Sequence, residues 1–238
     1  MTLVIAHRTL PRDAAENRLA GIRRAAAQGA DYVEVDVRRT RDGVPVLLHD
    51  PSLLRTGWRL RRIRSMTLDE VARVKLRGGH VLPTLADALA SAPDGLGFAL
   101  DTKDPGAAPA TLAAVDRARM GNRVLLWSQH DEAVRHYVAR APEGGAVALL
   151  RDTKTRAETD RYLGDTVSLG ATAISVHHSV LDDALLARAH EMGLTVHCWF
   201  QSLKVQAAKA ALPVDGIVTD WPRDAVERLA SLGRRERS

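Results

Sequence analysis

The chain has 238 residues, 45% hydrophobic and only 4% aromatic, which suits a single α/β domain over residues 1–238 with a mainly aliphatic core. Its only cysteine, Cys198, excludes a disulfide framework within the chain and lies in an apolar run typical of a small buried residue. The net charge is +5, but the basic clusters at residues 59–64 and 234–237 lack interleaved aromatic residues. We therefore interpret them as solvated surface and expect no nucleic-acid partner, while a bias toward anionic substrates remains.

The N-terminal residues read as a strand and show no signal-peptide pattern. No segment approaches the roughly 18 apolar residues that a membrane span requires. We expect a soluble, cytoplasmic protein without stable membrane insertion, and the sequence leaves its oligomeric state open.

The chain begins with a predicted strand over residues 3–7, which ends in the polar pair His7-Arg8. Residues 16–28 then carry apolar side chains at helical spacing, and Gly29 is a suitable C-cap for that helix.

Residues 31–50 predict two strands joined by a tight turn at Asp42-Gly43. Glu34 and Asp36 alternate with valines, so both carboxylates share one face of the first strand. Two such acids repel unless a cation lies between them, and oxygen ligands suit Mg²⁺ or Ca²⁺. A solvated strand face is the alternative, but the valine face is too apolar for an exposed ribbon.

Residues 53–82 are less regular and rich in arginine, with a capping box at Thr67–Glu70 that predicts a short helix. A second helix is expected from about residue 84 to 91.

The rest of the chain alternates strands and helices. The predicted strands cover residues 97–103, 123–128, 146–150, 173–177, 195–200 and 216–220. The predicted helices cover residues 109–119, 131–140, 156–169, 181–192, 202–211 and 222–232.

The strand that begins at Pro45 follows its predecessor through a turn and should pair antiparallel with it. Eight strands then alternate with helices, which predicts a TIM (β/α)8 barrel with a hairpin excursion over about residues 40–83. In such a barrel the functional residues gather where strands end. This rule brings together His7-Arg8, the two acids, His49, Asp101 and Lys103.

Several motifs, taken together and in order, resemble the glycerophosphodiester phosphodiesterase family. HR and EN, separated by seven residues, are followed by GADYVEVDV, TRDGVPVLLHDPSLLRT, MTLDEV, LPTLADAL, DTKDP and VDGIVTDWP. The resemblance extends from residue 5 to about residue 222 and implies a TIM barrel that hydrolyses glycerophosphodiesters to glycerol 3-phosphate and an alcohol.

The resemblance also implies a role for each matching residue. It makes His7 and His49 the general acid and base, and Glu34, Asp36 and Asp101 the ligands of one divalent cation, Mg²⁺ or Ca²⁺ with Mn²⁺ as a further candidate. The expected contacts with the small-molecule substrate and its phosphate come from Arg8, Lys103, Glu16 and Trp199.

Five positions depart from the family pattern. Thr9 replaces a glycine after HR, and Asp101 replaces a longer glutamate. Ala15 replaces a proline, and Phe200-Gln201 changes the segment after Trp199. These changes leave metal preference, substrate and rate open.

Two other functions stay open at this stage. One is a phospholipase D-like enzyme acting on lysophospholipids, which should show an exposed apolar rim. The other is a barrel that binds phosphodiesters with little or no catalysis.

Among the remaining candidates, we interpret Asp220 as a turn former or helix cap and His177-His178 as a structural pair. We expect His197 to have a surface or core role and Trp127 to serve packing.

Overall fold

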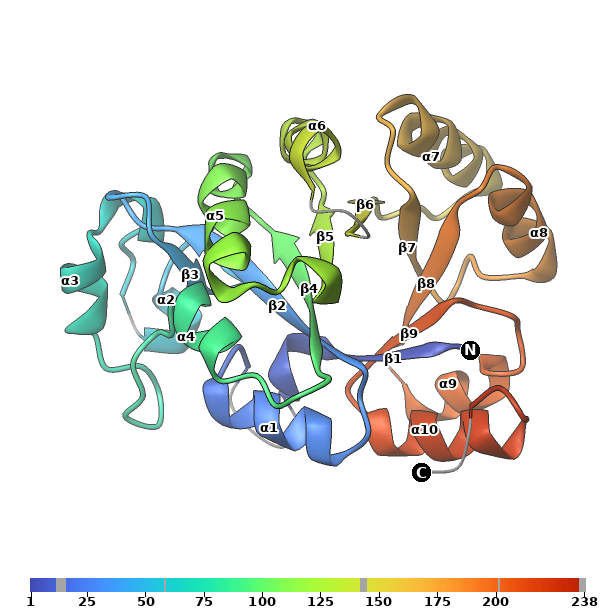
Figure 1. Cartoon of the computed structure of the whole chain (residues 1–238), viewed down its shortest axis with the longest axis horizontal. Helices are drawn as coiled ribbons and strands as arrows, with labels where there is room; N and C mark the ends of the chain where they lie inside the picture. The colour runs from blue at the N-terminus through green and yellow to red at the C-terminus, as the bar shows by residue number, and fades with distance from the viewer. Residues whose placement is uncertain (12–15, 58, 142–144, 201, 236–238) are drawn as a thin grey trace.

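The computed structural model describes residues 1–11, 16–57, 59–141, 145–200 and 202–235, so the departures at Ala15 and Gln201 lie outside the described residues. Eight parallel strands close into a barrel, because β1 pairs with β9 on one side and with β2 on the other (Figure 1). The ninth strand, β3, pairs antiparallel with β2. The predicted (β/α)8 barrel with a hairpin excursion is therefore confirmed.

The strands are β1 (Leu3–Ala6), β2 (Tyr32–Arg39), β3 (Pro45–Leu47), β4 (Gly97–Thr102), β5 (Val124–Ser128), β6 (Ala146–Leu150), β7 (Ala173–His177), β8 (Thr195–Phe200) and β9 (Gly216–Thr219). The α-helices are α1 (Leu19–Ala27), α2 (Leu54–Gly57), α3 (Leu68–Ala72), α4 (Leu85–Ala90), α5 (Ala108–Ala118), α6 (Asp131–Arg140), α7 (Arg156–Ser168), α8 (Asp183–Glu191), α9 (Leu203–Lys209) and α10 (Pro222–Ser231). Short 3₁₀ turns are η1 (His7–Thr9), η2 (Ile63–Ser65), η3 (Pro105–Ala107) and η4 (Gly121–Arg123).

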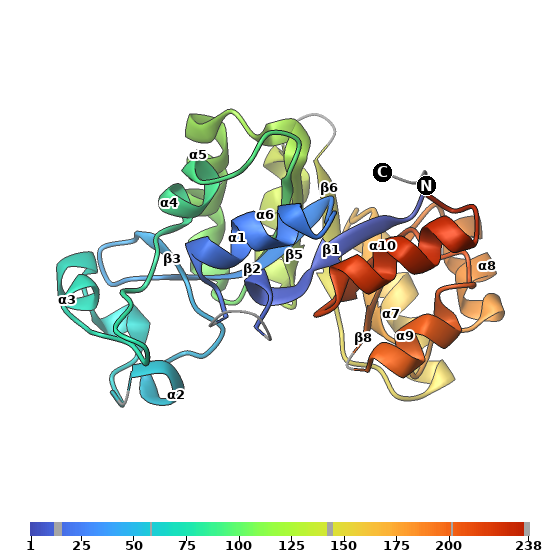
Figure 2. The same ribbon diagram turned by 90° about the horizontal axis from the view of Figure 1, so that it is seen from below.

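The main core lies between the sheet and the surrounding helices. The valines of β2 face this layer, opposite the acidic face predicted from their alternation. In Figure 2, α10 covers β1, and α1 lies beside α10. Cys198 is buried in the same layer, and burial raises the pKa of its thiol, as expected for a packing residue.

A smaller core fills the barrel interior with inward-facing side chains such as Ile5, Ala99 and Trp127. This packing fills the barrel below the carboxyl ends of the strands, so a site can form only above it, at the carboxyl end. The structure contains no helix, among the residues it describes, that is long and apolar enough to cross a membrane.

Residues 40–83, here called the insertion lobe, leave the barrel after β2 and return before α4. Figure 1 shows the lobe, in blue-green, projecting to one side of the barrel. It has its own hydrophobic cluster, which includes Leu53, Ile63 and Val71. The predicted capping box is confirmed: Thr67 and Glu70 bond reciprocally at the start of α3.

The first predicted helix begins later than its apolar spacing suggested. Asn17 has a φ of 55° and Arg18 is extended, so α1 starts only at Leu19. Likewise, His7 lies outside β1 and opens η1, because the chain turns sharply after Ala6. Both differences accompany contacts with the acidic face of β2, because the Arg8 amide donates to Glu34 and the Asn17 side chain donates to Asp36.

We predict that His197 makes the fold sensitive to acid. Its ring is 2% exposed, its Nδ1 has no hydrogen bond among the described residues, and burial lowers its pKa to about 4. In the unfolded chain the pKa of His197 is about 6.5, so below this pH the unfolded chain binds a proton that the folded chain does not. The free energy of unfolding therefore falls as the pH drops toward 4, by up to about 3 kcal/mol. Urea unfolding of His197→Leu should show a smaller stability loss between neutral pH and pH of about 4.5 than the parent does.

The matched control is His80→Gln at an exposed position, which should keep the parental pH dependence. An unchanged acid-dependent loss in His197→Leu would show that the buried ring does not titrate in this way.

Candidate active site

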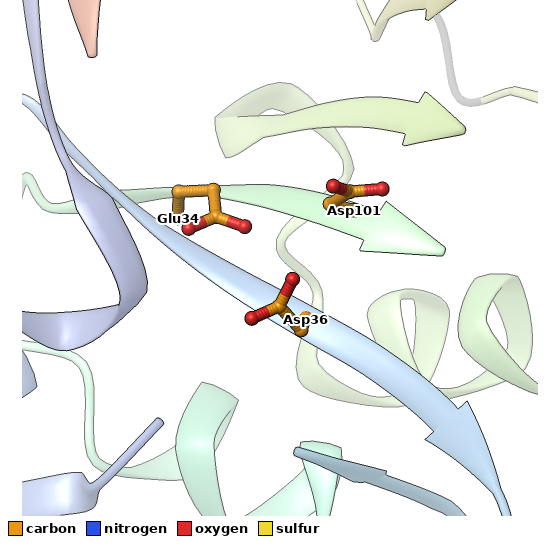
Figure 3. A group of neighbouring side chains, drawn as sticks. All are labelled: Glu34, Asp36 and Asp101. Carbon is orange, nitrogen blue, oxygen red and sulfur yellow. The ribbon is translucent and has the colours of Figure 1, made fainter. Parts of the chain in front are cut away.

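Three carboxylates converge on the inner face of β2 and β4. Glu34 and Asp36 come from β2, and the register places Asp101 of β4 directly beside Asp36. All three side chains are buried, and one ligand oxygen from each lies within 4.8 Å of the other two. Figure 3 shows the three carboxylates pointing into the same space. The predicted acidic site is thus assembled by strand alternation and register.

The carboxylates strongly perturb one another. Burial, with the charge of Asp36 next to it, raises the pKa of Glu34 to about 7. Burial also raises the pKa of Asp101, and its Oδ1 has no hydrogen-bond partner in the described part of the chain. Burial opposes ionisation of Asp36 as well, but Lys103 and Arg8 hold its pKa below the usual range.

Two cationic side chains border this cluster. The Lys103 ammonium contacts Asp101 Oδ2 and lies 3.2 Å from Asp36 Oδ1, and Arg8 Nε lies 3.3 Å from Asp36 Oδ2. Burial alone would lower the pKa of Lys103, but Asp101 and Asp36 raise it, so the lysine stays charged. The predicted phosphate contacts therefore lie beside the predicted metal ligands.

Both predicted catalytic histidines are bound by a carboxylate. His7 Nδ1 lies 2.8 Å from Asp220 Oδ1, and His49 Nδ1 lies 2.8 Å from Asp50 Oδ1. Burial alone would lower the pKa of His7, but the Asp220 hydrogen bond and the Glu34 charge raise it. Among the described residues, no hydrogen bond engages the Nε2 of either ring.

The helix-cap interpretation of Asp220 was wrong. The N-cap of α10 is Trp221, without a side-chain cap, and Asp220 instead binds His7 across more than two hundred residues of sequence. The sequence did carry a signal for this contact, namely the position of each residue at a strand end. Asp220 directly follows β9, and His7 directly follows β1, which pairs with β9.

His7 and Arg8 are aimed by a turn of unusual backbone conformation. Arg8, Thr9 and Leu10 all have positive φ, of 42°, 57° and 62°. A β-branched residue such as Thr9 rarely adopts this region, which explains why a glycine suits the position. The turn is fixed by the Arg8 amide, which donates to Glu34 Oε2 at 2.7 Å, and by Thr9 Oγ1, which accepts from Arg18 N at 2.8 Å.

Asn17 holds Asp36 in place. Its amide nitrogen donates to Asp36 Oδ2 at 2.8 Å, and its amide oxygen accepts from the Asp36 backbone at 3.0 Å. The sequence interpretation predicted a site role only for the neighbouring Glu16, although Asn17 belongs to the same EN pair.

Glu16 connects the barrel to the insertion lobe. It does not line the cavity described below; it binds Arg55 of α2 through two hydrogen bonds, of 2.5 and 3.0 Å, and lies 3.8 Å from Arg8. Arg55 also donates to Asp50 Oδ2 at 2.6 Å. Arg55 therefore bridges Glu16 and the carboxylate that holds His49.

A cavity of about 430 Å³ opens above these groups. Except for Glu16, every predicted site residue lines it, and Asp220 does so too. Trp199 contributes its half-buried ring, which packs 4.5 Å from the ring of His177. Polar lining residues that the sequence interpretation did not assign to the site include Gln129, Arg151 and Asp152, which follow the ends of β5 and β6.

His177 and His178 do not line the cavity, and their rings pack 4.0 Å apart. His177 Nδ1 bonds Ser179 Oγ at 2.6 Å, which suits a structural pair.

Comparison with known proteins agrees with this fold and site. Residues 7–224 match the glycerophosphoryl diester phosphodiesterase family. Probable glycerophosphodiester phosphodiesterase 2 of Mycobacterium tuberculosis is 31% identical over 215 residues, which cover 86% of this chain and 81% of the relative.

Two solved structures share the fold. A glycerophosphodiester phosphodiesterase from Parabacteroides distasonis aligns with a TM-score of 0.83 at 26% identity, over 98% of both chains. An Oleispira antarctica phosphodiesterase, solved in complex with the product sn-glycerol-3-phosphate, aligns with a TM-score of 0.83 at 22% identity, over 96% of this chain and 97% of that one.

The barrel and its site define a phosphodiesterase of the TIM-barrel class. The chain belongs to the glycerophosphoryl diester phosphodiesterase family.

We predict that Gly21→Ala disturbs the turn that carries His7 and Arg8. A Cβ at Gly21 would lie 1.9 Å from the Thr9 carbonyl oxygen, so the turn or α1 must move. The expected cost is about 1–3 kcal/mol of stability, with a loss of activity, measured by thermal denaturation and phosphodiester hydrolysis.

Gly164→Ala is the control, because a Cβ at this position in α7 meets nothing within 4 Å. It should stabilise the helix by about 0.4–1 kcal/mol and leave activity unchanged. Equal effects of the two substitutions would refute the close packing of α1 against the turn.

We predict that Arg55→Gln lowers kcat by about ten- to a hundredfold with little change in KM, because Asp50 loses the partner that orients it toward His49. Arg55→Lys should recover part of the loss. Arg61→Gln is the matched control, since Arg61 pairs with Glu70 in the same lobe, away from the histidine. A similar loss in both glutamine variants would indicate a general effect on the lobe.

Proposed function

We propose that this protein hydrolyses glycerophosphodiesters to sn-glycerol 3-phosphate and an alcohol, with one divalent cation held by Glu34, Asp36 and Asp101. The main support for this proposal is that three buried carboxylates and two histidines, each hydrogen-bonded to a carboxylate, line one cavity. Membership of the family supports the reaction class, and the product bound to the Oleispira antarctica phosphodiesterase is consistent with it.

The three carboxylates fit a divalent cation. Their oxygens lie within 4.8 Å of one another, and Asp101 Oδ1 is buried without a hydrogen bond in the described residues. Asp101 is shorter than the glutamate of the family pattern, but its register opposite Asp36 still brings it to the cluster. Oxygen ligands suit Mg²⁺, Ca²⁺ or Mn²⁺, and such a cation when bound stabilises negative charge on phosphate oxygens.

Arg8 and Lys103 are the proposed phosphate contacts. A phosphodiester carries one negative charge, and its transition state gathers more charge on the non-bridging oxygens. Fixed cationic groups at the cavity wall stabilise that charge without reorganising. Trp199 offers an apolar surface to the glycerol or to the alcohol portion.

The two histidines supply acid and base. Asp220 stabilises the imidazolium form of His7, which favours His7 as the proton donor to the departing alkoxide. The remaining role, general base, falls to His49, which takes the proton of the attacking oxygen. Asp50 fixes the ring of His49 through its Nδ1. That oxygen belongs either to water or to the neighbouring glycerol hydroxyl; the second route passes through a cyclic phosphate.

The test is release of sn-glycerol 3-phosphate from glycerophosphocholine and glycerophosphoethanolamine, with Mg²⁺, Ca²⁺, Mn²⁺ or EDTA. We expect release that requires a divalent cation and stops in EDTA. His49→Ala should lower turnover by about 10²–10⁴-fold, while calorimetry shows metal affinity close to that of the parent.

His80→Ala, at an exposed position, is the control and should keep full turnover. Release that persists in EDTA would overturn the metal requirement. Parental turnover in His49→Ala would remove His49 from catalysis, and no release with any cation would overturn the proposed substrate class.

A further inference from the structure

The insertion lobe carries the whole excess positive charge of the protein. Residues 40–83 contain nine basic and four acidic residues, a net charge of +5, which equals the net charge of the entire chain. The remaining residues therefore sum to zero. The fold gathers this arginine-rich segment into a separate lobe beside the barrel (Figure 1).

Much of this charge has no partner within the lobe. The side chains of Arg59, Arg62 and Arg64 are exposed and form no ion pair or hydrogen bond among the residues that the structure describes. Two of the four acids of the lobe are already engaged by other arginines, Asp50 by Arg55 and Glu70 by Arg61. The uncompensated charge is therefore available to an anionic partner.

The same segment presents apolar side chains to solvent. Leu60, between basic residues on both sides, is 79% exposed, and Leu54 is 48% exposed. Ile63 is buried in the cluster of the lobe and anchors the turn that carries Arg62 and Arg64. The lobe thus holds an exposed leucine and several arginines on one anchored segment.

This basic surface adjoins the active site. Arg62 and Arg64 line a groove of about 200 Å³ together with Arg38 and Lys103. Arg38 donates from Nε and Nη2 to the His49 carbonyl oxygen, at 2.9 and 2.6 Å. A partner bound at the lobe would therefore lie next to the mouth of the active site.

We infer that the insertion lobe docks on the surface of an anionic phospholipid bilayer. Arginines attract anionic head groups, and an exposed leucine among them gains by insertion at the boundary between head groups and acyl chains. Nucleic acid fits less well, because an exposed leucine gains nothing from a phosphate backbone and the described residues 59–64 offer no aromatic ring for base stacking.

The experiment is co-sedimentation of the full-length protein with vesicles of phosphatidylcholine alone and of equal parts phosphatidylcholine and phosphatidylglycerol. We expect binding only to the anionic vesicles, weakening as salt is raised. Combining Arg59→Gln, Arg62→Gln and Arg64→Gln should weaken it by about a hundredfold, and Leu60→Ser alone by about threefold.

The matched controls are Arg23→Gln, Arg156→Gln and Arg161→Gln combined, and Val167→Ser, all at exposed positions outside the lobe. They should bind as the parent does. Equal binding to both kinds of vesicle, no binding to either, or equal losses in the control variants would overturn the inference. A competing result would be that a double-stranded oligonucleotide binds as tightly as the anionic vesicles do, and that Leu60→Ser changes neither the affinity for the oligonucleotide nor that for the vesicles. This result would also overturn the inference.

Discussion

The site depends on holding three carboxylates together against their mutual repulsion. At a separation near 5 Å, two unit charges repel by roughly 3 kcal/mol for an effective dielectric constant of about 20. The barrel imposes this proximity because Glu34 and Asp36 share one face of β2 and Asp101 is their neighbour in β4. Burial and the neighbouring charge of Asp36 together raise the pKa of Glu34 to about 7, and a bound divalent cation would relieve the repulsion.

Much of the surrounding structure stabilises the three carboxylates at this short separation. Lys103 and Arg8 lie against Asp36, and Asn17 bonds the same carboxylate from the loop before α1. The positive φ values after His7 have the same origin, since the chain must turn back sharply for the Arg8 amide to reach Glu34. Local backbone strain of this kind persists because hydrogen bonds around it fix the geometry.

The active site also joins two parts of the molecule that differ in charge. Arg55 of the insertion lobe bonds Glu16 from the barrel and Asp50 beside His49, so the lobe contributes both a histidine and its support. The barrel sums to zero charge while the lobe carries +5. An approaching anion, whether a small diester or a membrane surface, therefore meets its strongest attraction on the lobe side of the cavity.

The sequence by itself determined the barrel, its antiparallel excursion and the shared face of Glu34 and Asp36, because these follow from local periodicity and the order of elements. Only the tertiary structure decided that Asp220 binds His7 and that Arg55 links Glu16 to Asp50. The contacts of Asp220 with His7 and of Arg55 with Glu16 join residues far apart in the chain. Their geometry follows from strand register and from turns with positive φ, which no local pattern of residue types specifies.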